Sequence, residues 1–133
     1  MAKILIISRE EDVRNFTSRF FTERNFGVLE TESVKEGLSI VGREEPDIVL
    51  LGIETPDSEG LDPVKAINSV NPKTRTIIIS SIDDVEVMQR SLQSGAVAFL
   101  GKPILLSELM DIVVSNLRKS RSFFELTVEP KNE

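Results

Sequence analysis

Five residues with distinct chemistry follow the aliphatic runs of this sequence. Ser8 and Arg9 come after one run, Gly52 after a second, Ser80 after a third and Lys102 shortly after a fourth. The hydroxyl of Ser80, the two cations and the backbone N–H groups of Gly52 and Ile53 could together surround a phosphate or sulfate ion. The same two cations could instead form surface ion pairs, which contribute about 0–1 kcal/mol each.

Three acidic residues stand close to these positions in the sequence, namely Glu10, Glu54 and Asp57. Any of them could pair with Arg9 or Lys102 and hold the side chains in one arrangement. The two positive charges would also repel a divalent cation. The sequence therefore leaves two hypotheses open, an internal ion pair and a small anion site.

Composition limits the chemistry and the class of partner. The chain contains no cysteine and no histidine, which excludes disulfides, His/Cys zinc sites, thiol nucleophiles and histidine-assisted serine catalysis. Acidic residues outnumber basic ones by 22 to 16, and the net charge of −6 disfavours nonspecific binding to nucleic acid or to an anionic membrane. No apolar run approaches the roughly 20 residues that span a bilayer, and no cationic leader opens the chain, so we expect a soluble cytoplasmic protein.

Continuous aliphatic runs indicate strands that are covered on both faces of a parallel sheet. The expected strands are residues 4–7, 28–31, 48–51, 77–79 and 97–100, and the expected helices follow them at about 13–24, 33–41, 61–67, 85–92 and 105–117. Five such units predict an α/β fold, a doubly wound sandwich around a five-stranded parallel sheet, with its functional loops at the carboxyl ends of the strands. The domain is expected over residues 1–119, and residues 120–133 as a tail or linker.

Local signals mark the sides and ends of the helices. Phe16 and Phe20 are expected on the apolar side of the first helix, because they are spaced one turn apart. Ser33 is expected to cap the second helix, and Gly42 to end it. Gly95 is the expected end of the fourth helix.

Four segments carry a resemblance to the receiver domain of two-component response regulators. They are KILII at residues 3–7, PDIVLLGIETPDSEG at 46–60, IIISSIDDVE at 77–86 and GAVAFLGKP at 95–103. The resemblance covers essentially residues 3–118. It implies a (βα)5 flavodoxin-like fold and a role in phosphorelay signal transduction.

Receivers of this family accept a phosphoryl group on an Asp that ends the third strand, with Mg²⁺ held by that Asp and by an acidic pair after the first strand. Ser8 and Arg9 stand at the positions of the acidic pair, and Gly52 stands at the acceptor position. Pro56 and Gly60 fix this register, because they follow the acceptor position at the family's spacing. All three carboxylates are therefore missing, and we expect Mg²⁺ binding to be lost and no catalytic residue or cofactor to remain.

The supporting half of the family's site is still present. Ser80 stands where the family has the hydroxyl that contacts the phosphoryl group, Lys102 where it has the pairing ammonium, and Phe99 at its aromatic switch position. Ser80 could equally satisfy local backbone groups, and Phe99 could simply pack in the core. The resemblance implies a degenerate, non-enzymatic receiver that does not depend on phosphorylation.

Such a receiver is expected to act by binding a protein partner. It is not expected to bind nucleic acid or a membrane. The family commonly uses the face formed by its fourth helix, fifth strand and fifth helix. The residues expected on that face here are Gln89, Arg90, Gln93, Ser94, Ser115, Asn116, Arg118 and Lys119. They contain no large apolar patch, and the oligomeric state stays open.

Two other functions remain possible from the sequence. A working phosphorelay receiver could use Asp57 or Glu54 as an unusual acceptor, although the metal-binding pair would still be missing. A small anion-binding flavodoxin-like domain is the other alternative. It lacks a glycine-rich phosphate loop, since residues 8–11 contain no glycine.

Overall fold

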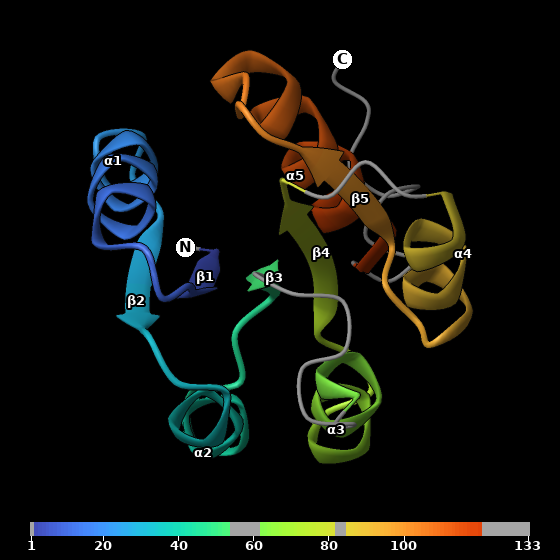
Figure 1. The fold of residues 1–133 in the computed structure, drawn as a ribbon. Coiled ribbons are helices and arrows are strands. Elements are labelled where there is room, and N and C mark those ends of the chain that lie inside the picture. The colour runs from blue at the N-terminus through green and yellow to red at the C-terminus, as the bar shows by residue number, and fades with distance from the viewer. Residues whose placement is uncertain (1, 54–61, 82–84, 121–133) are drawn as a thin grey trace, which may run out of the picture.

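The computed structural model describes residues 2–53, 62–81 and 85–120 and shows five parallel strands alternating with five helices (Figure 1). The strands are β1 (Lys3–Ile7), β2 (Gly27–Thr31), β3 (Ile48–Ile53), β4 (Arg75–Ser80) and β5 (Ala98–Gly101). The helices are α1 (Glu11–Thr22), α2 (Val34–Glu44), α3 (Pro63–Val70), α4 (Val85–Gln93) and α5 (Leu106–Ser120). The expected doubly wound, flavodoxin-like α/β class is confirmed.

The strands lie in the order β2-β1-β3-β4-β5, so the chain crosses from one side of the sheet to the other after β2. Figure 1 shows α1 and α5 on one face of the sheet, α2 and α3 on the other, and α4 beside β5. One apolar cluster, which includes Ile6 and Leu50, fills the α1/α5 side. A second cluster, which includes Leu5 and Val49, fills the other side. Neighbouring residues of the central strands thus belong to opposite clusters, as a strand covered on both faces requires.

The observed helix ends agree with the sequence in part. Ser33 caps α2, because its side chain accepts a hydrogen bond from the backbone N–H of Glu36. Gly95 has a φ of 120° just beyond α4, as predicted for a glycine that ends a helix. Gly42 was wrong as a helix end: α2 continues to Glu44, and Glu45 takes the left-handed conformation at φ 49°.

The apolar side of α1 also differs from the prediction. Phe16 is 40% exposed, whereas Phe21 is fully buried. The ring of Phe21 packs edge-to-face between Phe20 and Phe26, with ring centroids 5.1 and 5.2 Å away. The buried residues of α1 are Thr17 and Phe21, which lie one turn apart, so the side of the helix that faces the sheet runs through these two positions and not through Phe16.

Residues 121–133 lie outside the described residues, so the predicted tail and the domain boundary at residue 119 stay predictions. Among the helices that the structure describes, none combines the length and apolar character needed to cross a bilayer.

Candidate functional site

Four of the expected site residues meet at the carboxyl edge of the sheet. Ser8 directly follows β1, Gly52 lies near the end of β3, and Ser80 ends β4. The backbone register places Gly52 beside Ile79 and Ser80 beside the end of β5, from which Lys102 follows. The sequence therefore correctly predicted that these residues share one end of the sheet.

Ser8 is held firmly against Gly52. Its side chain is buried, with only 3% of the residue exposed. Its hydroxyl accepts a hydrogen bond from the backbone N–H of Glu10 at 3.1 Å, and its carbonyl accepts one from Arg14 at 2.8 Å. A Cβ atom built at residue 52 would lie 3.2 Å from the Ser8 hydroxyl oxygen, closer than an ordinary van der Waals contact. A side chain at residue 52 would thus begin in tight contact with Ser8, which would have to shift by a few tenths of an ångström.

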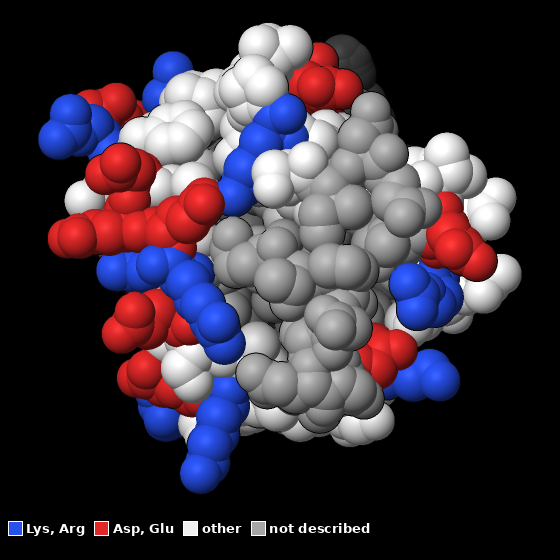
Figure 2. All heavy atoms as spheres, viewed as in Figure 1, with Lys and Arg blue, Asp and Glu red and all other residues white. Residues whose placement is uncertain are grey.

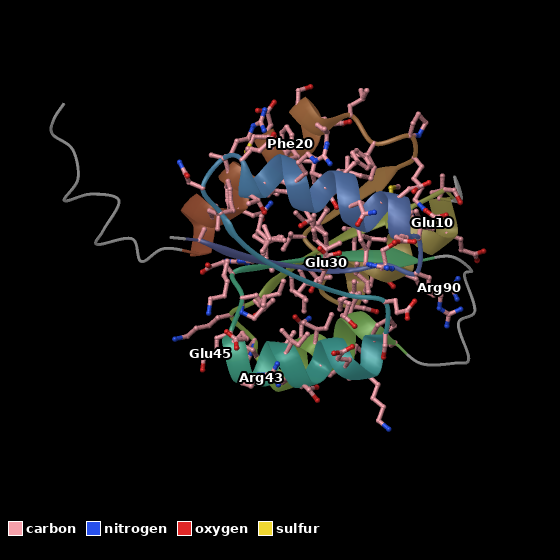
Figure 3. The ribbon with its side chains drawn as sticks, turned by 90° about the vertical axis from the view of Figure 1, so that its left-hand side faces the viewer. Glu10, Phe20, Glu30, Arg43, Glu45 and Arg90 are labelled. Carbon is pink, nitrogen blue, oxygen red and sulfur yellow. The ribbon has the colours of Figure 1, made fainter. Side chains whose placement is uncertain are left out.

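Lys102 forms an ion pair with Glu10 across this edge. Glu10 precedes α1 and Lys102 follows β5, so the pair joins two loops that are 92 residues apart in the sequence. Figure 3 shows Glu10 at the end of α1 that lies at this edge. The side chain of Lys102 is 16% exposed and that of Glu10 47% exposed. An internal ion pair, one of the two hypotheses drawn from the sequence, is therefore present.

The other charged candidates are placed differently. Arg9 is exposed and forms no ion pair with any other residue that the structure describes. Glu54 and Asp57 lie outside the described residues. Among the described candidates, Glu10 and Lys102 are therefore the two that form an ion pair with each other.

Ser80 and Phe99 are both part of the packed structure. Ser80 is fully buried, and its carbonyl accepts a hydrogen bond from the backbone N–H of Lys102 at 2.9 Å. Phe99 is partly buried and packs against the apolar cluster on the α2/α3 side. This position agrees with the packing role that the sequence left open for Phe99.

Arg14 is a site residue that the sequence reasoning missed. Besides its bond to the Ser8 carbonyl, its guanidinium lies 3.6 Å from the carboxylate of Glu30 on β2. The available signal was its spacing, because Arg14 lies one helical turn after Glu10 and points back toward the start of α1. Figure 2 shows positive and negative side chains interspersed over α1, β2 and α2 on this side of the molecule.

The residues at this edge do not fit a Mg²⁺ site of the family type. Ser8 is neutral and already hydrogen-bonded, Arg9 carries a positive charge, and Gly52 offers no side chain. Over residues 2–53, 62–81 and 85–120, no three acidic side chains gather closely enough to share a metal ion. The Glu10 carboxylate also lies at this edge, but it forms an ion pair with Lys102. Mg²⁺ requires carboxylate oxygens in near-octahedral positions, and Ser8, Arg9 and Gly52 do not supply them.

The expected interaction face is only partly exposed. Gln89, Arg90, Gln93 and Ser115 are exposed, as predicted. Asn116 was wrong as a surface residue, because it is buried and donates a hydrogen bond to the carbonyl of Ile112. Ser94 is only partly exposed and bonds to Asp62, and the side chains of Arg118 and Lys119 are outside the described residues.

Comparisons with known proteins agree with this architecture. A family model described as the response regulator receiver domain matches residues 4–114. Sporulation initiation phosphotransferase F of Bacillus subtilis is 27% identical over 111 residues, which cover 84% of this chain and 90% of that protein. Response regulator protein PilR of Pseudomonas aeruginosa is 30% identical over 116 residues, which cover 87% of this chain.

Solved structures show the same fold. A two-component response regulator from Clostridium difficile matches with a TM-score of 0.84 at 24% identity, over 92% of this chain and 100% of that chain. Several curated relatives are much longer, since the matched part is 26% of PilR and 32% of a cyclic di-GMP phosphodiesterase from Thermotoga maritima. The family model spans most of the 133 residues. The chain therefore belongs to the family of response regulator receiver domains.

Proposed function

We propose that this receiver domain works without phosphorylation and signals by binding a protein partner. The observation that carries the proposal is the packing of Ser8 against Gly52, with a hydroxyl oxygen 3.2 Å from where a Cβ of residue 52 would lie. A glycine at the acceptor position has no carboxylate to form an acyl phosphate. The neighbouring Ser8 supplies no carboxylate either, so the side chains of these two positions leave Mg²⁺ without an acidic ligand.

The Glu10–Lys102 ion pair supports the same proposal. In the family, the lysine at this position pairs with the phosphoryl group. Here the ammonium of Lys102 already has a carboxylate partner from the loop after β1. A phosphoryl group that approached Lys102 would meet the negative charge of Glu10 beside it. The Glu10 carboxylate thus supplies the negative charge beside Lys102 that phosphoryl transfer would otherwise add.

A protein surface is the kind of partner that the exposed residues favour. The side of α4 that faces solvent carries Gln89, Arg90 and Gln93, and interspersed charges lie over α1, β2 and α2 (Figure 2). Neither region is a continuous basic stripe, which nucleic acid or an anionic membrane would require. We assign the function to protein contacts within two-component signalling for this reason.

The test is an amide NMR titration of the whole chain with millimolar Mg²⁺ and then beryllofluoride, which mimics the phosphoryl group. The expected result is that the resonances of Gly52, Ser80, Phe99 and Lys102 stay in place. Intact mass after incubation with acetyl phosphate should likewise show no added phosphoryl group. A receiver with all three carboxylates serves as the positive control.

The opposite outcome would point to a working phosphorelay receiver. If the four resonances shift together and saturate, the lost carboxylates have been replaced by other groups. Peptide mapping of a phosphorylated chain would then decide between Glu54 and Asp57 as the acceptor. Shifts caused by phosphate alone, without Mg²⁺, would instead support a small anion site.

A further inference from the structure

Glu10 stands at the start of α1, but its side chain does not serve the helix. It is the N-cap residue, and its backbone carbonyl accepts a hydrogen bond from the N–H of Arg14 at 3.1 Å. An N-cap residue usually accepts a further backbone N–H of the first turn with a side-chain oxygen. The Glu10 side chain makes no such bond and pairs with Lys102 instead. The path of the chain just before α1 therefore decides where this carboxylate lies.

Two neighbouring residues of opposite charge follow Ser8 in this short segment. Of the two, Glu10 pairs with Lys102, whereas Arg9 is exposed. A different path of the chain that brought Arg9 inward would place its positive charge beside that of Lys102, and the two would repel each other. The ion pair itself is partly exposed to water, and such pairs are weak. Other contacts must therefore hold the segment in the observed conformation.

Arg14 reaches back from α1 to this segment. Its Nη1 donates a hydrogen bond to the carbonyl of Ser8 at 2.8 Å, and its Nε lies 3.6 Å from Oε1 of Glu30 on the edge strand β2. Figure 3 shows Glu10 and Glu30 on the side of the domain that α1 and β2 form. A cation near the N-terminus of a helix gains nothing from the helix dipole. The two oxygen partners therefore account for the place of this guanidinium, whose side chain is only 18% exposed.

The bond from Arg14 sets the direction of the chain between Ser8 and Glu10. The Ser8 carbonyl belongs to the planar peptide group that joins Ser8 to Arg9, so a bond that fixes this oxygen fixes the whole plane. The N–H of Ser8 donates to the carbonyl of Thr31 at 3.0 Å, and its hydroxyl accepts from the N–H of Glu10 at 3.1 Å. Among these three contacts, the one from Arg14 has a charged donor, and such hydrogen bonds are the stronger ones.

We propose that Arg14 is a positioning residue of this site: by holding the Ser8 carbonyl, it keeps Arg9 outside and Glu10 against Lys102. Glu30 supports it by orienting the guanidinium. The effect passes from Arg14 through the segment to the ion pair, since the pair is too exposed to hold the segment. The inference rests on the proposed function, because it names what keeps Lys102 paired with a carboxylate of the chain itself.

NMR spectra of the whole chain that correlate lysine Nζ with the Hε protons test the positioning role. The Lys102 resonance is assigned by its loss in Lys102→Met, and Glu10→Gln gives its position when the ion pair is broken. Arg14→Met keeps an unbranched apolar side chain but removes every donor. It should shift the Lys102 resonance toward the Glu10→Gln position. Glu30→Gln should shift it in the same direction but less, because the bond from Arg14 to the Ser8 carbonyl remains.

Arg19→Met makes the same chemical change at an exposed position of α1 and should leave the Lys102 resonance in place. If Arg14 merely stabilised the fold, Arg14→Met would lower the urea midpoint of unfolding without moving this resonance in the folded protein, and the proposal would be overturned. An unmoved resonance in Glu30→Gln would overturn it as well, which keeps the test decisive should Arg14→Met fail to fold. Shifts caused by beryllofluoride in the unchanged protein would instead reject the proposed function, so the two failures are distinguishable.

Discussion

The carboxyl edge of the sheet is built from residues whose effects depend on their neighbours. Gly52 lacks the acceptor side chain, Ser8 is neutral and packs tightly against Gly52, and Arg9 adds a positive charge where a metal ligand would be needed. Glu10 already forms an ion pair with Lys102. Restoring one residue therefore leaves the others opposed to the family's chemistry.

We expect Gly52→Asp alone to gain neither Mg²⁺ binding nor phosphorylation by acetyl phosphate. It would add one carboxylate, while Ser8 and Arg9 still supply no second acidic ligand for Mg²⁺. The triple variant Ser8→Asp, Arg9→Asp, Gly52→Asp supplies all three carboxylates and should bind Mg²⁺ measurably. The measurement is a Mg²⁺ titration followed by amide NMR, with intact mass as the second readout. Mg²⁺ binding by the single variant would show that Ser8 and Arg9 are not the obstacle.

The Glu10–Lys102 ion pair should contribute little to stability although it closes the site. Both side chains are partly in contact with water, so Glu10→Gln should lower the free energy of unfolding by no more than about 1 kcal/mol. High salt should shrink the difference, because salt screens exposed charges. Urea unfolding at low and high salt measures it. Glu32→Gln is the charge-matched control, since Glu32 is exposed and is not in an ion pair with any described residue. A loss several times larger would mean that the pair holds the two loops together.

Sequence reasoning located these residues but not their partners. The aliphatic runs before Ser8, Gly52 and Ser80 fixed them at one edge, because parallel strands all end there. Nothing in the sequence selected Glu10 over Glu54 or Asp57 as the partner of Lys102. That choice depends on the path of the loops, which periodicity does not specify.

At the scale of elements, the caps and turns are where single side chains set stability. The Ser33 side chain accepts from the backbone N–H of Glu36 at 3.1 Å, so Ser33→Ala leaves that N–H without its partner. We expect a loss of about 0.5–2 kcal/mol in the free energy of unfolding. Ser39→Ala makes the same chemical change at an exposed position within α2 and should be neutral or slightly stabilising. Equal effects of the two variants, compared by urea unfolding, would contradict a capping role.

Two glycines should respond to alanine in opposite directions. At Gly95 the positive φ and the nearby Asn68 oppose a side chain, so Gly95→Ala should cost about 1–3 kcal/mol. Gly42 lies inside α2, and its Cβ would meet only Val70 at 3.4 Å. Gly42→Ala should therefore stabilise the protein by up to about 1 kcal/mol, because alanine favours helix. Thermal unfolding of both variants measures the difference in sign, and a stabilising Gly95→Ala would contradict the observed turn.

The same two glycines explain which helix ends the sequence could predict. Glycine favours a helix end where the chain needs a positive φ, and this condition holds at Gly95. At Gly42 the backbone stays helical, and Glu45 makes the turn instead. Composition alone does not distinguish these cases. The strands were easier to predict, because burial on both faces leaves an unbroken aliphatic run.

For the molecule as a whole, the central strands link two apolar clusters into one folding unit. Adjacent residues of β1, such as Leu5 and Ile6, belong to opposite clusters. If the central strands unfold, the apolar side chains of both clusters become exposed to water. Damage on one face should therefore lower the stability of the entire sheet.

Phe21→Ala tests that coupling on the α1/α5 face. Phe21 is fully buried between two other aromatic rings, so its removal should cost about 3–5 kcal/mol. Phe16→Ala, on the same helix but 40% exposed, should cost less than about 1 kcal/mol. Urea unfolding, followed by circular dichroism and by the exchange of β4 amides, measures both. One transition that moves to lower urea for every probe, with an unchanged slope, is expected because β4 contributes to both clusters. Two separate transitions for Phe21→Ala would mean that the faces of the sheet unfold independently.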